Sequence, residues 1–164
     1  MLAIVTKELP PCGVYRTVKQ IAGIEPDRFV YFHNHGNPGP GLYFPEKWNA
    51  NRAVFSQNGT TVPEDFDPRS IRSLPNEGFY RVTRAFHCCE KKCTQFEPEQ
   101  MLQLGYNGNG RGILFTPEYA NGVIRVPERG SVIDDEAFKS LVALKLPEVE
   151  QKNDLSIPRG FVVH

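Results

Sequence analysis

Apolar and polar residues alternate over short distances along most of this chain, which is typical of β-strands. In the first half, strands are expected at residues 2–6, 15–21, 29–35 (FVYFHNH), 42–44, 53–55 and 60–62. In the second half they are expected at 79–85, 101–106, 113–115, 123–126 and 132–133. Residues 101–106 could also end a helix that starts at Pro98, but their match to 29–35 favours a strand. Glycine- and proline-rich turns separate these segments. The pattern therefore predicts a mainly all-β fold.

The order of strands and turns occurs twice, first over 13–59 and again over 78–130. The segment Gly13-Val-Tyr-Arg16 returns as Gly78-Phe-Tyr-Arg81, 65 positions later. Further along, Gly36-Asn37 returns as Gly108-Asn109, 72 positions later. We interpret this self-similarity as an internal duplication of a five-stranded unit of ~50 residues. The change of offset predicts a seven-residue insertion in the second copy.

A five-stranded unit of this size has too little sheet to bury two faces unless it curls on itself. Small SH3-like barrels, one in each unit, would solve this problem. The alternative is a single fused barrel or a sandwich to which each copy contributes half. This architecture carries no function by itself, because small barrels host many unrelated activities.

The segments between and after the copies complete the expected domain organisation. The first β-unit spans 1–62, a proline- and acid-rich connector follows at 63–77, and the second β-unit spans 78–133. Residues 134–164 are expected to form one short helix and a C-terminal strand at 157–163, both packed on the β-units. Acidic residues 134–136 suit the first turn of that helix, and Phe138, Leu141 and Val142 share one face.

The charge balance disfavours one class of partner. Lys and Arg together number 19, as do Asp and Glu, so the formal net charge is zero. Proteins that bind nucleic acid through phosphates usually carry a basic excess. No apolar run approaches the ~18 residues that a membrane span requires. With no signal peptide in view, we expect a cytoplasmic protein with reduced cysteines.

The predicted insertion holds a cluster of metal-ligand residues, His87, Cys88, Cys89 and Cys93. Thiolate and imidazole are the ligands that zinc takes tetrahedrally. Against this, adjacent cysteines point apart in an extended segment, and the spacing matches no common zinc finger. Cys12, or the alternate histidines His33 and His35, could complete the site. Thiol redox chemistry and simple packing of the thiols are the alternatives.

Aromatic side chains next to prolines suggest a binding surface. Trp48, the single tryptophan, follows Tyr43 and Phe44 in the first copy, and Tyr119 occupies the corresponding loop of the second. Exposed aromatic residues of this kind bind peptides, especially extended or proline-rich ones. The alternative is that Trp48 closes one end of a barrel.

The chain shows no glycine elbow around a serine, no phosphate-binding loop and no dinucleotide fingerprint, so we expect no catalytic residues. We favour a non-enzymatic protein- or peptide-binding module with two related β-units. The first alternative is a zinc-binding or thiol-redox protein that uses His87–Cys93. The second alternative is a nucleic-acid-binding small barrel, SH3-like or OB-like, which the neutral charge weakens.

Overall fold

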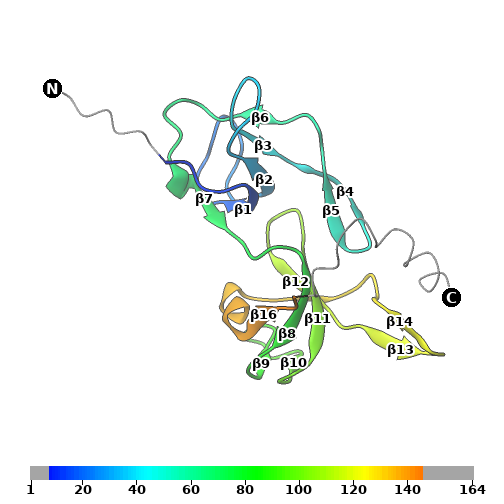
Figure 1. Cartoon of the computed structure of the whole chain (residues 1–164). Helices are drawn as coiled ribbons and strands as arrows, with labels where there is room; N and C mark the ends of the chain where they lie inside the picture. The colour runs from blue at the N-terminus through cyan, green and yellow to red at the C-terminus, as the bar shows by residue number, and fades with distance from the viewer. Residues whose placement is uncertain (1–7, 146–164) are drawn as a thin grey trace.

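The computed structural model describes residues 8–145, and these are mostly β (Figure 1). The prediction of a mainly β fold is thus confirmed. The strands expected at 2–6 and 157–163 lie outside the described residues. Two five-stranded antiparallel sheets form the body of the molecule, and three two-stranded hairpins extend from it.

The first sheet has the order β6-β3-β2-β1-β7. Its central strand β2 carries the strongest β-pattern of the first half. Val30 and Phe32 point into the core of this sheet and are fully buried. The strands are β1 (Gly13–Thr17), β2 (Phe29–His33), β3 (Gly41–Tyr43), β6 (Thr60–Thr61) and β7 (Ile71–Ser73).

The second sheet has the order β15-β12-β11-β8-β16. Its central strand is β11, at the residues for which the sequence favoured a strand. Leu102 and Leu104 fill its core. The strands are β8 (Gly78–Val82), β11 (Met101–Tyr106), β12 (Gly112–Phe115), β15 (Ser131–Val132) and β16 (Leu141–Ala143).

Corresponding strands of the two sheets pair in the same register. Gly13 lies opposite Phe32 in the first sheet, and Gly78 lies opposite Leu104 in the second. These partners are shifted by 65 and 72 positions, the offsets found in the sequence. Each sheet also continues into a long hairpin after its third strand: β4 (Pro45–Asn49) with β5 (Arg52–Phe55), and β13 (Glu118–Ala120) with β14 (Val123–Arg125).

The third hairpin lies where the sequence placed the insertion. In the first half, Ile21 pairs with Ile24 around a two-residue turn. In the second half, Phe86 pairs with Phe96 instead, and nine residues lie between them. The hairpin comprises β9 (Phe86–His87) and β10 (Gln95–Phe96).

The predicted SH3-like barrels are not found, because both sheets remain open within residues 8–145. Each sheet covers part of its apolar surface with the other half of the chain. Phe29 of β2 stacks on Tyr106 of β11, with ring centroids 4.9 Å apart, and both side chains belong to one shared hydrophobic cluster. Packing between the sheets therefore replaces closure of each sheet on itself.

The helix expected from residue 134 is shorter than the sequence suggested. A 3₁₀-helix, η2, covers Asp135–Ser140, and the chain then enters strand β16. Leu141 pairs with Val82 at the edge of the second sheet. The open backbone groups of β8 offer hydrogen bonds that outweigh the intrinsic helical preference of this segment, so the predicted helix is wrong beyond Ser140.

Residues 63–77, expected as a connector, contain the short 3₁₀-helix η1 (Pro68–Ser70) and strand β7. β7 pairs with β1 and completes the first sheet. Ile71 is buried in the core of the first sheet, and Leu74 is buried in the cluster shared by both sheets. This segment therefore belongs structurally to the first sheet and links it to the second.

Candidate metal centre

The β4–β5 hairpin covers one face of the second sheet. Gln103 donates a hydrogen bond of 3.0 Å to the backbone oxygen of Ala50 and accepts one of 3.0 Å from Asn51. A side chain at Gly105 would bring its Cβ within 2.6 Å of the Asn51 backbone oxygen. The absence of a side chain at Gly105 therefore lets the hairpin tip approach the sheet this closely.

The equivalent face of the first sheet carries different residues. Shifted by 72 positions, Gln103 corresponds to Tyr31 and Gly105 to His33. Shifted by 65, Glu77, which accepts a hydrogen bond of 2.9 Å from the backbone N–H of Ala53, corresponds to Cys12. Three residues contact the β4–β5 hairpin in the second half: Gln103, Gly105 and Glu77. The corresponding residues of the first half are a tyrosine, a histidine and a cysteine.

Cys12, His33 and His35 come together on this face. The Sγ atom of Cys12 lies 3.7 Å from Nδ1 of His33 and 3.7 Å from Nδ1 of His35. One ligand atom from each of the three residues lies within 4.8 Å of the others. The cysteine and His33 are half-buried, and His35 is exposed. We call this group the Cys12–His33–His35 cluster.

Asn34 holds the cysteine in place. Its backbone N–H donates to the Cys12 sulfur at 3.3 Å, and its side-chain oxygen lies 3.3 Å from the same sulfur. The side-chain amide of Asn34 also donates to the backbone oxygen of Pro10 at 3.3 Å. The segment that carries Cys12 is therefore tied to the end of β2, at His33, and to the segment after it that carries His35.

The spacing of the cluster suits a tetrahedral metal ion. With Zn–S near 2.3 Å and Zn–N near 2.0–2.1 Å, tetrahedral geometry puts a ligand sulfur and a ligand nitrogen about 3.5 Å apart. The two observed sulfur–nitrogen distances of 3.7 Å need only small adjustments to reach this value. Three protein ligands leave one coordination position for water or another ligand.

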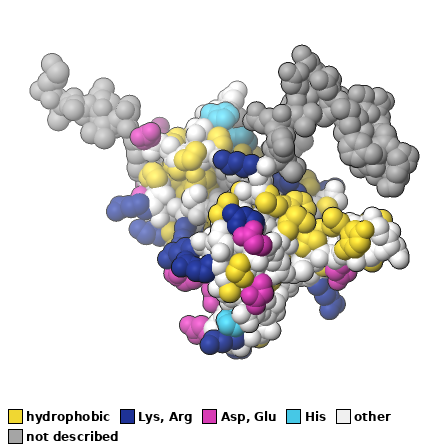
Figure 2. Space-filling model, turned by 60° about the horizontal axis from the view of Figure 1, so that its bottom comes forward, with side chains coloured by type: hydrophobic (Ala, Val, Ile, Leu, Met, Phe, Trp, Pro, Cys, Tyr) yellow, Lys and Arg dark blue, Asp and Glu magenta, His cyan; other side chains and the backbone are white. Residues whose placement is uncertain are grey.

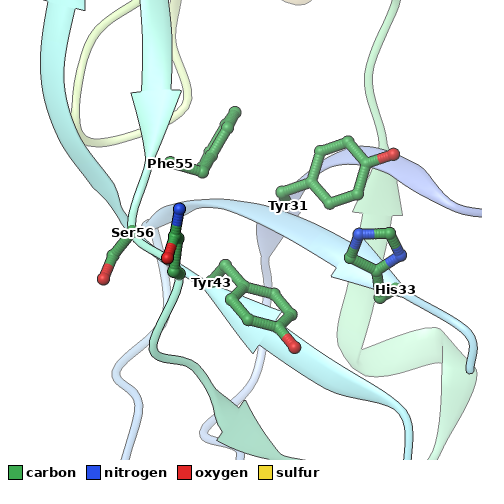
Figure 3. A pocket seen from close by; sticks show the side chains of 6 residues that line it. Tyr31, His33, Tyr43, Phe55 and Ser56 are labelled. Carbon is green, nitrogen blue, oxygen red and sulfur yellow. The ribbon is translucent and has the colours of Figure 1, made fainter. Parts of the chain in front are cut away.

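An aromatic pocket of about 420 Å³ lies beside the cluster (Figure 3). Tyr31 and Tyr43 flank His33, with centroids 4.9 Å and 5.7 Å from the imidazole ring. Phe55 and Ser56 close the other side, from the end of β5. His33 is the link between the two features, because it belongs to the cluster and also lines the pocket.

A second group of sulfurs lies in the β9–β10 hairpin. Cys88, Cys89 and Cys93 have their Sγ atoms within 4.8 Å of one another, and we call them the three-thiol cluster. The sulfurs of Cys88 and Cys89 are 3.5 Å apart. The expectation that adjacent cysteines point apart is thus wrong here, because the segment turns after Cys88 instead of continuing as a strand. His87 pairs within β9 and β10 and does not belong to the group.

The thiols of this cluster influence one another's proton affinity. The pKa of Cys89 lies below its usual value, chiefly because the Cys88 thiol hydrogen-bonds to it and also because the backbone N–H of Lys91 donates to it. The pKa of Cys93 is raised, chiefly by the negative charge at Cys89. Cys89 is therefore the thiol of this pair that loses its proton first.

The four aromatic residues expected to bind a partner do not form one surface. Tyr43 lines the pocket beside the Cys12–His33–His35 cluster. Phe44 lies under the guanidinium of Arg28, 4.7 Å from ring centroid to Cζ. Trp48 lies in β4, is 43% exposed and donates a hydrogen bond of 2.9 Å to the Tyr106 backbone oxygen. Tyr119 is 75% exposed on the β13–β14 hairpin.

The sequence predicts Cys12, His33 and His35 only as additional ligands of a site at His87–Cys93. The structure instead makes them a separate cluster. Alternate histidines on a strand were the available signal, since positions two apart share a face. The sequence held no comparable signal that Cys12, 21 residues before His33, would meet them.

Comparison with protein-family models, with curated proteins and with solved structures found no match for this chain. Within residues 8–145 we find no helix with the length and apolar character needed to cross a membrane.

Proposed function

We propose that this protein is a zinc-dependent binding module, with the metal held by the Cys12–His33–His35 cluster. The observation that carries the proposal is that two imidazole nitrogens each lie 3.7 Å from one cysteine sulfur, with all three ligand atoms within 4.8 Å of one another. Cysteine thiolate and histidine imidazole are both ligands that zinc takes. The ion would occupy the face between the end of β2 and the segment before β1.

The neighbouring pocket supports a role in binding rather than a purely structural one. Structural zinc sites normally have four protein ligands, whereas three come together here among residues 8–145. The fourth position would be free for a donor atom of a ligand whose apolar part enters the pocket lined by Tyr31, Tyr43 and Phe55. A peptide meets both requirements when it carries an acidic, thiol or imidazole group, which would bind the metal, next to an apolar side chain, which would enter the pocket.

We also propose that the two halves of the chain arose by internal duplication. The shared strand order, the matching register and the equivalent hydroxyls of Tyr15 and Tyr80 support it. If so, the corresponding faces of the two sheets have since diverged in sequence and in what they contact. In the second half the face accepts a hairpin, and in the first half Cys12 and His33 occupy the corresponding positions.

Cobalt substitution provides the direct test. Anaerobic titration with Co²⁺ should give the near-ultraviolet thiolate-to-cobalt absorption and the visible bands of a tetrahedral site. Cys12→Ser should remove the thiolate band, and His33→Gln should weaken binding of both Co²⁺ and Zn²⁺. His87→Gln is the matched control, because this exposed histidine lies outside the cluster. Unchanged cobalt spectra in Cys12→Ser, or loss in His87→Gln, would contradict the proposal.

A second candidate function rests on the β13–β14 hairpin, which projects from the body of the molecule (Figure 1). Its side chains Tyr119, Val123 and Ile124 are 75%, 57% and 60% exposed, and hydrophobic side chains gather on this side of the surface (Figure 2). The tip of the equivalent β4–β5 hairpin instead contacts the second sheet. We propose that the β13–β14 hairpin binds an apolar segment of a protein partner.

Peptide selection on the immobilised protein tests this second function. Peptides selected on the wild type should lose binding to the Tyr119→Ser/Ile124→Ser variant. Val18→Ser is the control, since Val18 is an exposed apolar residue, at 41%, away from the hairpin. If the selected peptides bind all three proteins equally, the hairpin is not the binding surface.

A further inference from the structure

The three-thiol cluster is a second group of potential ligands, separate from the Cys12–His33–His35 cluster. The loop between β9 and β10 folds back on itself. Cys88 donates its backbone N–H to Thr94 at 2.9 Å, and Lys92 donates to the Cys89 carbonyl at 2.9 Å. The backbone N–H of Thr94 also donates to the Cys88 sulfur at 3.3 Å. These bonds hold the sulfurs together without any disulfide.

The ligand set is purely sulfur. Among residues 8–145, no further cysteine, histidine or carboxylate joins Cys88, Cys89 and Cys93 in one group. Zinc in structural sites takes four ligands, and its catalytic sites use at least one nitrogen or oxygen ligand. Soft thiolates with a coordination number below four suit Cu(I) better, since it has no need of a fourth ligand.

We propose that Cys88, Cys89 and Cys93 bind one Cu(I) ion in trigonal geometry. The ion keeps its oxidation state. The three thiols lose three protons to solvent and form three Cu–S bonds, which leaves a site of charge −2. The exposed ammonium groups of Lys91 and Lys92, in the loop between Cys89 and Cys93, offset part of this charge.

The burial of the three sulfurs is graded. Cys88 is 3% exposed, Cys89 is half-buried and Cys93 is exposed. An ion can therefore enter from the Cys93 side and become partly shielded from water at Cys88. This arrangement fits reversible capture of Cu(I) by ligand exchange, in which an incoming thiolate replaces one sulfur at a time.

The two clusters differ in ligand softness, so each should prefer its own metal. The Cys12–His33–His35 cluster contains two imidazoles, which suit divalent zinc. The three-thiol cluster contains only sulfur. The Cu(I) proposal does not depend on the zinc proposal, and the two fail in different measurements.

The test is an anaerobic Cu(I) titration of the reduced full-length protein in competition with bathocuproine disulfonate, followed by copper X-ray absorption spectroscopy. One equivalent should bind with three sulfur neighbours. Cys89→Ser and Cys93→Ser should each lose the three-sulfur signature, whereas Cys12→Ser, the matched control, should keep it. Circular dichroism checks that each variant is folded, and Cys93 is exposed, so its replacement leaves the core intact.

Three results would overturn the proposal. The first is a three-sulfur signature that persists in both Cys89→Ser and Cys93→Ser. The second is copper bound with nitrogen neighbours and lost in Cys12→Ser, which would place it at the other cluster. The third is Zn²⁺ held by the three thiols in preference to Cu(I) when both metals are supplied at equal concentration.

Discussion

Arg16 in the first sheet is paired with Asp135, which begins the 3₁₀-helix before the last strand of the second sheet. The Nη1 atom of Arg16 donates to Oδ1 of Asp135 at 3.1 Å and to the backbone oxygen of Gly110 at 3.1 Å. The Arg16 side chain is 4% exposed and that of Asp135 is 19% exposed. This partly buried ion pair joins residues 119 positions apart and helps to hold the two sheets together.

Removing the carboxylate should destabilise the protein strongly. Asp135→Asn leaves the Arg16 guanidinium buried without its counter-charge, at a cost of about 3 kcal/mol in the free energy of unfolding. The matched control is Glu99→Gln. Glu99 pairs at 2.9 Å with Arg81, the residue equivalent to Arg16, but this pair is exposed and should contribute less than about 1 kcal/mol. Chemical denaturation measures both, and equal effects would contradict the structural role of Arg16.

The same pair makes stability depend on pH. The pKa of Asp135 is lowered, chiefly because Arg16 donates a hydrogen bond to its carboxylate. A carboxyl group with a lowered pKa stabilises the folded state above its unfolded pKa, about 3.9, and this contribution is lost as the pH falls through the folded value. The free energy of unfolding should therefore fall more steeply below pH ~4 in the wild type than in Asp135→Asn. Asp67, whose pKa Arg69 lowers to about 2, titrates in both proteins and cancels in the comparison.

Docking of the β4–β5 hairpin should be sensitive to one methyl group. Gly105→Ala would bring Cβ within 2.6 Å of the Asn51 backbone oxygen, so the hairpin must shift at a cost of about 1–3 kcal/mol. Gly108→Ala is the control, because its Cβ would meet no atom within 4 Å. Fluorescence of Trp48, the single tryptophan, should shift to the red in Gly105→Ala only. An unchanged spectrum would mean that the hairpin tip does not depend on this close approach.

The proposed duplication predicts equal roles for two tyrosines. The hydroxyl of Tyr15 donates to the backbone oxygen of Pro11 at 2.6 Å, and that of Tyr80 donates to Asn76 at 2.6 Å. Tyr15→Phe and Tyr80→Phe should each lower the free energy of unfolding by about 1 kcal/mol. Thermal or chemical denaturation measures both. A loss at only one of the two would argue against equivalent positions.

Zinc should stabilise the folded protein through the Cys12–His33–His35 cluster. Free zinc at a hundred times its dissociation constant adds about 2.7 kcal/mol to the free energy of unfolding. The melting temperature should therefore rise in the wild type and in His87→Gln, and chelation should reverse the rise. Cys12→Ser should show no such increase. Stabilisation of Cys12→Ser to the same extent would place the zinc elsewhere.

The local pattern of the chain was enough to predict most strands, because alternation and turn residues are properties of neighbouring positions. Strand β11 was ambiguous by its local pattern and was predicted from its match to residues 29–35, and the change of offset between the two copies placed the β9–β10 hairpin. The pattern failed at Leu141–Ala143. Spacing alone suggested a helix there, but pairing with the edge of β8 decided the conformation.

The sequence by itself determined that the chain is mainly β, that its motifs recur at offsets of 65 and 72 positions, and which residues could carry chemistry. Only the tertiary structure decided which of those residues meet. Cys12 reaches His33 because β1 pairs with β2 in one register, and His87 turns away from the thiols because it pairs within its hairpin. Strand register and packing between sheets are long-range contacts, and a pattern of neighbouring residues does not specify them.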